Sequence, residues 1–309
     1  MKNSFIYKII FATIILIIII FILFNLDILP KTGNYELYSP FKNIISSDEN
    51  NSFQKINDNI PKIDSAIASY PFVSKLIEST IDKNSYNDEL QYVPTPQAYQ
   101  NIIENKVDFS IASETNKYQR SFIENDPDIK LIPIAKEALV FYTNKDNPIK
   151  SLTINELNDI YGEEISNWNL LGGEDLRIFP YQQNKNIGGS EECFAQVVTN
   201  NTSFTNSEYI AYDMNNIIDL TAKNKGGIGY AFNMFCTKLY NSESIKLISI
   251  NDIFPSYENI VTGKYPLMYN VYFVYRESNT NPNIKKILDW LLSTEGQELV
   301  AKNGYQPIK

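Results

Sequence analysis

Histidine is absent from this chain of 309 residues, and cysteine occurs only twice, as Cys193 and Cys236. Without histidine, the Ser-His-Asp and Cys-His arrangements of nucleophilic catalysis are excluded. Two separated cysteines also provide too few of the usual ligands for a zinc site. Their spacing is compatible with a disulfide and equally with two buried thiols. We therefore expect no metal centre, and the sequence leaves the state of the cysteines open.

Adjacent carboxylates do not supply an alternative catalytic site. Glu163–Glu164 and Glu191–Glu192 are the two pairs that could be proposed for acid–base work. Neighbouring residues of a helix point about 100° apart, so neither pair converges on one substrate. Such pairs are typical of solvated charges near helix ends. The sequence predicts a protein that is not an enzyme and that needs no cofactor.

Positive charge is scarce: the chain has 27 Lys and Arg residues and 36 Asp and Glu residues, which gives a net charge of -9. Proteins that bind the phosphate backbone of nucleic acids present surfaces rich in Lys and Arg, so nucleic acid is not expected as a partner. A small anion is not excluded, because backbone N–H groups and local dipoles hold an anion whatever the charge of the whole protein.

A long apolar run does occur at the N-terminus, where residues 5–26 are almost all Ile, Leu and Phe. This is close to the roughly 20 residues that cross a bilayer. Lys2 lies before this run and Lys8 lies near its start. Positive charges at this end favour an N-terminus in the cytoplasm and a body outside. A cleaved signal peptide is the alternative, but no small-x-small cleavage site follows the run. We predict an uncleaved signal anchor over residues 1–29, a polar tether over 30–60, and a body held outside the cytoplasm at the cell membrane.

From Lys62 onward, strand-like and helix-like segments alternate, and this order is typical of a mostly parallel sheet with flanking helices. Two long stretches, Leu131–Tyr142 and Tyr265–Tyr275, are apolar and rich in β-branched or aromatic residues. These two stretches bracket the central section of the chain. The amphipathic pattern of 283–302 predicts one long helix that ends before Gly304.

Residues 146–173 carry the most informative local pattern. Thr153 is followed three residues later by Glu156, a capping-box spacing, and an apolar helical face comes next. The helix leads into Asn167-Trp168 and the pair Gly172-Gly173. This order of residues resembles a segment of the phosphate-type, PstS-like solute-binding proteins of the type II periplasmic-binding-protein superfamily.

The resemblance extends over about residues 60–309 through several collinear segments. They are Leu139–Asn144, Gly227–Tyr230, Tyr265–Leu267, Leu292–Gln297 and Gly304–Ile308. It implies an α/β fold of two lobes joined by a hinge of two crossing strands, which we assign to Leu131–Tyr142 and Tyr265–Tyr275. Lobe 1 is then formed by residues 61–140 and 257–309, and lobe 2 by residues 141–256. It also implies a small ligand, phosphate or another oxyanion, that is captured between the lobes and presented to the permease of an ABC transporter.

The resemblance places the ligand-binding residues in three loops. In the first loop, Ser65, Ala66, Ile67 and Ser69 follow Asp64, and Ile67 stands where a hydroxyl residue is usual, so that Ser65 or Ser69 is left to supply the hydroxyl. The second loop offers Asp108, Ser110 and Ser113, since relatives use an Asp here or nearby. The alternative interpretation is that Asp108 only closes the loop between a helix and a strand.

The third loop contributes Gln183, Gly188, Gly189 and Ser190. Relatives carry an Arg at the position of Gln183 and a Ser at the position of Ile187. Losing the cation removes a charge-assisted contact worth about 1.5–3 kcal/mol, and each 1.4 kcal/mol is about tenfold in affinity. The sequence therefore predicts a solute-binding protein of weakened phosphate affinity. The alternative is a membrane-anchored sensor or interaction protein with a degenerate pocket.

Overall fold

The structure is a computed structural model that describes residues 52–86, 90–184, 188–197 and 207–308. The predicted signal anchor and most of the predicted tether lie outside these residues. Within the described ranges, no helix combines the length and the apolar character needed to cross a bilayer.

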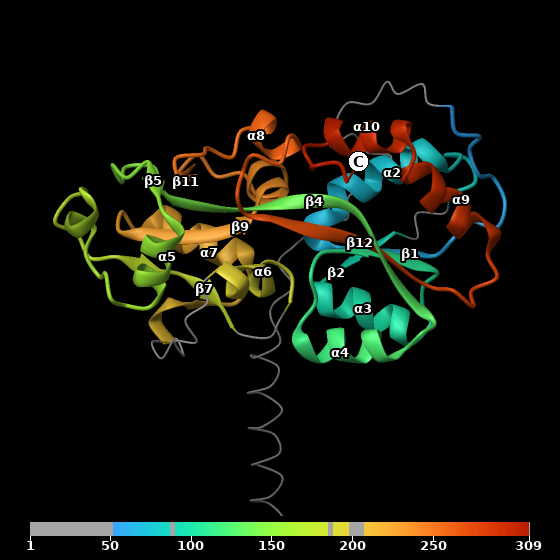
Figure 1. Ribbon diagram of the computed structural model, residues 1–309, viewed down its shortest axis with the longest axis horizontal. Coiled ribbons are helices and arrows are strands. Elements are labelled where there is room, and N and C mark those ends of the chain that lie inside the picture. The colour runs from blue at the N-terminus through green and yellow to red at the C-terminus, as the bar shows by residue number, and fades with distance from the viewer. Residues whose placement is uncertain (1–51, 87–89, 185–187, 198–206, 309) are drawn as a thin grey trace, which may run out of the picture. The chain divides into compact units, whose positions relative to one another are not determined.

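Two α/β lobes share one mixed sheet, whose strand order is β2-β1-β3-β12-β4-β9-β6 (Figure 1). Lobe 1 contains β1 (Ile63–Ala66), β2 (Gln91–Val93), β3 (Phe109–Ala112), η1 (Ile67–Ser69), α2 (Tyr70–Thr80), α3 (Thr95–Ile103), α4 (Lys117–Asn125), α9 (Pro282–Leu291) and α10 (Thr294–Lys302). Strand β1 lies parallel to both β2 and β3. The predicted alternation of strands and helices is confirmed in this lobe.

Lobe 2 holds the central part of the chain, and its core is separate from the cores of lobe 1. Its elements are β5 (Ser151–Leu152), α5 (Ile154–Tyr161), η2 (Trp168–Leu171), β6 (Phe179–Pro180), β7 (Gln182–Gln183), α6 (Ser190–Val197), η3 (Ser207–Tyr209), β8 (Ile210–Ala211), α7 (Met214–Lys223), β9 (Gly227–Phe232), the π-helical turn η4 (Phe235–Leu239), β10 (Ile245–Leu247), β11 (Ser249–Ile250) and α8 (Tyr257–Val261). The predicted capping box of Thr153 and Glu156 is present at the start of α5.

Strand β4 (Ile129–Asn144) belongs to both lobes and is flanked by β12 (Met268–Arg276). Residues up to Ala138 pair with β12, and residues from Leu139 onward pair with β9. The long β4 and β12 ribbons run side by side from one lobe to the other in Figure 1. The chain turns back to lobe 1 only after Leu267, because Ile260, Tyr265 and Leu267 are buried in the core of lobe 2.

The helices of lobe 1 cover both faces of its part of the sheet (Figure 1). Helices α2, α9 and α10 pack on one face around Phe72, Phe109 and Phe273. Helix α3 packs on the other face, where Tyr99 and Val274 share a smaller core. This two-sided burial explains why the lobe 1 strands are almost continuously apolar.

The predicted single helix over 283–302 is wrong, because the chain forms two helices that break at Leu292–Ser293. The Ser293 side chain caps α10 by accepting from the N–H of Gly296, and Gln297 donates to the Leu291 carbonyl oxygen at 2.9 Å. A polar cap satisfies the first N–H groups of a new helix, so the amphipathic pattern continues while the axis changes.

Part of the predicted tether lies against lobe 1. Ile56 is buried in the lobe 1 core and forms a bridge with Ile81. The Phe53 ring makes an edge contact with Trp290 at 5.4 Å between centroids. Residues 52–60 are therefore packed onto the body by apolar contacts.

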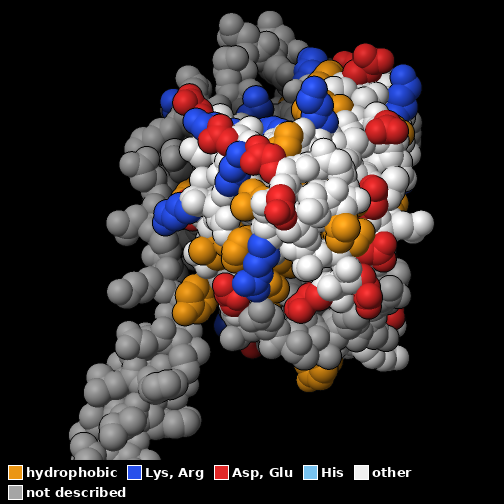
Figure 2. All heavy atoms as spheres, turned by 90° about the vertical axis from the view of Figure 1, so that its left-hand side faces the viewer, with side chains coloured by type: hydrophobic (Ala, Val, Ile, Leu, Met, Phe, Trp, Pro, Cys, Tyr) orange, Lys and Arg blue, Asp and Glu red, His pale blue; other side chains and the backbone are white. Residues whose placement is uncertain are grey.

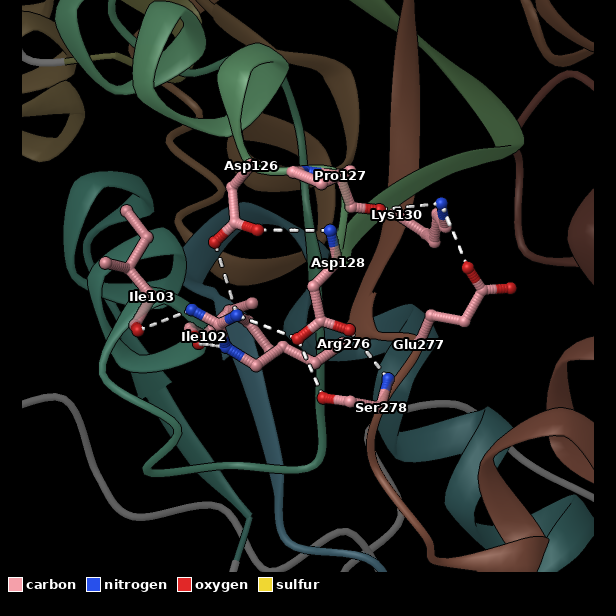
Figure 3. Close-up of polar contacts among 9 residues, drawn as sticks. All are labelled: Ile102, Ile103, Asp126, Pro127, Asp128, Lys130, Arg276, Glu277 and Ser278. Carbon is pink, nitrogen blue, oxygen red and sulfur yellow. Dashed lines mark hydrogen bonds and ion pairs between the residues drawn. The ribbon is translucent and has the colours of Figure 1, made fainter.

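Arg276 at the end of β12 joins three segments of lobe 1 (Figure 3). Its guanidinium donates to the carbonyl oxygens of Ile102 and Ile103 at 3.1 and 2.8 Å, where α3 ends. It also pairs with Asp126 at 3.3 Å and Asp128 at 2.9 Å. A cation stabilises a helix C-terminus, and the planar guanidinium serves several acceptors at once. This network anchors β12 and α3 to the segment between α4 and β4.

The face of the molecule that carries β5 and α5 shows Lys and Arg side chains interspersed with Asp and Glu, and scattered apolar side chains (Figure 2). Ion pairs of lobe 2 include Lys225 with Glu174 at 2.7 Å. This face gathers no large area of one charge sign.

The break between α9 and α10 gives a test of packing. In a Gly296→Ala variant, the new Cβ would lie 2.3 Å from the Trp290 carbonyl oxygen and 2.5 Å from the Leu291 Cα. Both are backbone atoms, so we expect a loss of about 1–3 kcal/mol in the free energy of unfolding, measured by urea denaturation. The control, Glu298→Ala at an exposed position of α10, should stay within about 0.5 kcal/mol of the parent. Equal losses in the two variants would contradict this account of the helix break.

Candidate functional site

The candidate site lies at the carboxyl ends of the parallel strands of lobe 1, where η1 with α2, α3 and α4 begin. In open α/β sheets this edge is where ligands bind, and helix N-termini carry partial positive charge there. The turn before α6 of lobe 2 meets the same edge. We call the loops 66–69 and 113–116, together with Gln183 and residues 188–190, the interlobe site.

The first loop contacts lobe 2 through apolar atoms. Ala68 is buried in the core of lobe 2, and Ile67 packs against that core. The Ser65 hydroxyl is fully buried and donates to the Ala66 carbonyl oxygen at 2.9 Å. Ser69 is buried at the N-cap of α2 without a capping hydrogen bond from its side chain. The first loop therefore meets lobe 2 through apolar side chains.

Asp108 lies at the amino end of β3, at the opposite end of the strand from the interlobe site. Its carboxylate accepts hydrogen bonds from the Lys62 N–H at 2.8 Å and from the Asn279 side chain at 2.7 Å. The alternative interpretation, in which Asp108 closes a loop between a helix and a strand, describes this geometry. We therefore leave Asp108 out of the interlobe site.

Ser110 and Ser113 are both buried, and neither hydroxyl has a hydrogen-bond partner among the described residues. Ser110 stands in the middle of β3, in register with Asp64 of β1. The Asp64 carboxylate binds the Asn101 side chain, and burial raises its pKa. Ser113 follows the end of β3, and its carbonyl oxygen accepts from the Tyr99 hydroxyl at 2.8 Å. Only Ser113 of the pair reaches the interlobe edge.

Glu114 is the residue of this edge that the sequence interpretation missed. Its carboxylate accepts from the Tyr272 hydroxyl at 2.8 Å and pairs with Arg120 at 3.2 Å. The Arg120 guanidinium also lies 5.4 Å from the centroid of the Tyr272 ring. The available signal was its position directly after Ser113, since an acidic residue that follows a parallel strand lies at the ligand edge while one that precedes the strand does not.

Gln183 and Ser190 meet at the start of α6. The Ser190 hydroxyl donates to the Gln183 side-chain oxygen at 3.0 Å, and the Gln183 N–H donates to the Tyr230 hydroxyl at 3.1 Å. Both residues are buried. Ile187 and Lys185 lie outside the described residues. Gln183 is therefore a neutral amide whose side-chain oxygen is bound to Ser190 in the first turn of α6.

Gly188 and Gly189 bring lobe 2 into contact with lobe 1. The Gly189 N–H donates to the Glu114 carbonyl oxygen at 2.8 Å. Both glycines have positive φ, at 75° and 67°, which favours residues without a Cβ. A Cβ on Gly189 would lie 3.0 Å from the Thr95 hydroxyl, and one on Gly188 would lie 3.3 Å from the Asn116 nitrogen. The two lobes therefore touch through backbone at this turn.

Charges of both signs face one another across the contact. Burial raises the pKa of Glu192 in α6, while Lys117 lowers it, Glu114 raises it and Arg120 lowers it. Three of these groups come from lobe 1, so Glu192 faces lobe 1. The Cys193 and Cys236 thiols are free and buried, which confirms the second of the two open interpretations.

The groups at this contact are of the kinds that bind a small polar or anionic ligand. Helix starts, backbone N–H groups and the Ser113 hydroxyl surround the contact, and Arg120 is a cation beside it. In the described part of the chain, no three His, Cys, Asp or Glu residues are placed to hold a metal ion.

These features define a bilobed α/β fold with a site between its lobes. The chain belongs to the PBP superfamily, whose domain model matches residues 62–295. It is similar to the phosphate-binding protein PstS of Borreliella burgdorferi, with 25% identity over 182 residues that cover 57% of this chain and 64% of that protein. For the phosphate-binding protein PstS of Bacillus subtilis, the identity is 26% over 177 residues, 57% of this chain and 56% of the relative. The chain thus spans less than two thirds of the length of these curated relatives.

Solved structures show the same fold. A putative phosphate ABC transporter substrate-binding protein with bound phosphate from Clostridium perfringens matches with a TM-score of 0.65 and 23% identity, over 80% of this chain and 98% of that one. An ABC-type phosphate transport receptor from Vibrio cholerae matches with a TM-score of 0.58 and 18% identity, over 79% and 98%. At these identities the likeness concerns the fold alone.

The glycine turn gives a matched pair of variants. Gly189→Ala and Gly172→Ala both place a Cβ on a residue with positive φ, at 67° and 79°, but only the first Cβ meets the other lobe. We expect both to lose about 1–2 kcal/mol of stability from the left-handed backbone. Hydrogen exchange at the amide of residue 189 should become faster in Gly189→Ala but not in Gly172→Ala. The reason is that the new Cβ strains the hydrogen bond from this amide to the Glu114 carbonyl oxygen. Equal protection of the residue 189 amide against exchange in the two variants would refute the interlobe contact.

Proposed function

We propose that this protein is an extracytoplasmic solute-binding protein that closes its two lobes on phosphate or a related oxyanion. It presents this ligand to the permease of an ABC transporter, and residues 1–29 hold it at the membrane as a signal anchor. The observation that carries the proposal is the direct meeting of the Gly188–Ser190 turn with the Glu114–Asn116 loop. The two lobes touch where α2, α3, α4 and α6 begin. Helix N-termini attract anions, so closure of the lobes at this place would enclose an anion.

The names of the relatives support the choice of ligand class. Each of the two curated relatives is called a phosphate-binding protein, and the structural neighbour from Clostridium perfringens contains bound phosphate. The ligand-binding residues that we propose are Ser113, Gly188, Gly189 and Ser190, with the backbone of Ala66–Ser69 and with Arg120 as the nearby cation. Ser65, Ile67, Ser110 and Gln183 complete the set as neighbours of these loops.

Affinity for phosphate is expected to be modest, for a physical reason. The Gln183 side chain is neutral and is already engaged by Ser190, and Ile67 packs against the core of lobe 2. Arg120 shares its charge with Glu114 and with Glu124, at 3.2 and 3.3 Å. A phosphate ion must therefore compete with two carboxylates for the available cation.

Restoring a cation at position 183 tests the site. In Gln183→Arg the guanidinium would supply charge-assisted hydrogen bonds worth about 1.5–3 kcal/mol, so we expect phosphate to bind roughly ten- to a hundredfold more tightly. The measurement is calorimetric titration of the purified full-length chain, in detergent, with inorganic phosphate. Gln183→Met is the control, because it keeps the length of the side chain without adding a charge.

The titration also decides between the functions. Saturable phosphate binding by the parent that rises in Gln183→Arg supports the solute-binding function. A parent and an arginine variant that are both silent towards phosphate, sulfate and neutral metabolites would instead favour a tethered sensor or interaction protein with a degenerate pocket.

A further inference from the structure

The two lobes exchange single apolar residues across their boundary. Ala68, from the first loop of lobe 1, is 6% exposed and belongs to the core of lobe 2. Ile67 beside it packs against the same core. In the opposite direction, Met234 follows β9 of lobe 2, is 3% exposed and belongs to a core of lobe 1. Each lobe therefore completes part of the other lobe's core.

The C-terminal segment of lobe 1 contacts both exchanged residues. The Tyr305 hydroxyl donates to the Ala68 carbonyl oxygen at 3.4 Å, and the Tyr305 ring lies 5.3 Å from the Phe72 ring between centroids. A Cβ on the neighbouring Gly304 would lie 3.3 Å from the Met234 sulfur, so the sulfur packs closely on this backbone. Both exchanges therefore meet lobe 1 at residues 304–305.

Hydrogen bonds accompany the exchange. The Met234 N–H donates to Oε1 of Glu137 at 2.8 Å, in the part of β4 that pairs with β12. At the interlobe site, the Gly189 N–H of lobe 2 donates to the Glu114 carbonyl oxygen of lobe 1 at 2.8 Å. We call Ala68, Met234 and the bond between Gly189 and Glu114 the interlobe latch.

Separation of the lobes disrupts the interlobe latch. Ala68 and Met234 would each leave the core of the opposite lobe, and the Gly189 N–H would lose its acceptor. Burial of apolar surface is favourable, and protein interiors are packed too closely for a side chain to leave without losing contacts. Contacts between the lobes therefore stabilise closure by themselves.

We propose that the interlobe latch holds the two lobes closed in the resting protein, so that Ala68 and Met234 must be released before a ligand enters the interlobe site. The anion then binds a protein whose closed form is populated before binding, and it does not drive closure. The role in ligand entry rests on the proposed function. The closed resting state does not, because every contact of the latch lies within the protein.

Distances between the lobes test the resting state. Spin labels are attached to the full-length chain in detergent at Glu298→Cys in lobe 1 and Leu170→Cys in lobe 2, which replace exposed side chains. The same labelling of the parent controls for reaction at the buried thiols of Cys193 and Cys236. Pulsed electron paramagnetic resonance should give one distance population without phosphate. Two populations without phosphate overturn the closed resting state.

Met234→Ala tests the latch itself, and Met214→Ala is the matched control. Met214 packs against the core of its own lobe. Without phosphate, hydrogen exchange at the amide of residue 189 should become about ten- to a hundredfold faster in Met234→Ala, because opening exposes less apolar surface. The rate is compared with that of the β3 amides, which report unfolding of lobe 1. Met214→Ala should match the parent in this ratio.

A second variant guards against misfolding of Met234→Ala. Ala68→Ser keeps the side chain small but places a hydroxyl in the core of lobe 2, so it should also accelerate exchange at residue 189 relative to β3. If exchange at residue 189 keeps the parent ratio in both Ala68→Ser and a folded Met234→Ala, the latch is overturned.

Inorganic phosphate separates the latch from the proposed function. Binding is measured by calorimetric titration, and the spin-label distance is measured again at saturation. Phosphate that binds the parent without changing the distance supports closure before binding. A new distance on saturation shows that the ligand drives closure and overturns the latch. If phosphate binds neither the parent nor the variants, the proposed function fails, while the exchange rates without phosphate still decide the role of Ala68 and Met234.

Discussion

Strand β4 is part of the sheet in both lobes and holds the two lobes together. Strand β4 forms hydrogen bonds with β12 on the side of lobe 1 and with β9 and β10 on the side of lobe 2. Because backbone hydrogen bonds within a sheet are obligatory when buried, neither half of β4 can leave its partners without exposing unpaired groups. Ala138 and Leu139, where the partner of β4 changes, are therefore the junction between the two lobes in this strand. The chain returns to lobe 1 after Leu267, and the Leu139 N–H donates to the Leu267 carbonyl oxygen at 2.9 Å, so the returning segment is attached to β4 at the same point.

This constraint explains why the interlobe site is made mostly of backbone. The two lobes meet at the Gly188–Ser190 turn, where side chains are absent or small and where N–H groups can approach the opposite loop. Around this turn, the polar side chains satisfy one another: Gln183 with Ser190, and Glu114 with Tyr272 and Arg120. The charged and polar groups at this contact therefore largely satisfy one another within the protein.

Hydrophobic periodicity and capping residues were sufficient to predict the alternation of strands and helices in lobe 1, the helix that begins at Thr153 and the long apolar strand β4. The Thr153 capping box and the apolar run of β4 lie in single uninterrupted segments, and local rules apply to such segments without knowledge of the rest of the chain. The helix over 283–302 was predicted as one element because periodicity does not register a change of axis when a cap such as Ser293 preserves the apolar spacing. Asp108 was proposed for the site although it lies before β3, while Glu114 lies after it. Six residues of extended chain span about 20 Å, so the two acids stand at opposite edges of the sheet.

The amino-acid sequence by itself determined the order of strands and helices, the absence of histidine chemistry, and the neutral side chain at position 183. These properties depend on residue identity and on neighbours within a few positions. The tertiary structure alone decided that Glu114 and Arg120 share the interlobe edge, that the two cysteines are buried free thiols, and that burial raises the pKa of the Glu137 carboxyl. Such properties depend on burial and on distances between residues as far apart as Ala68 and Tyr305, and these are set only when the sheet has assembled.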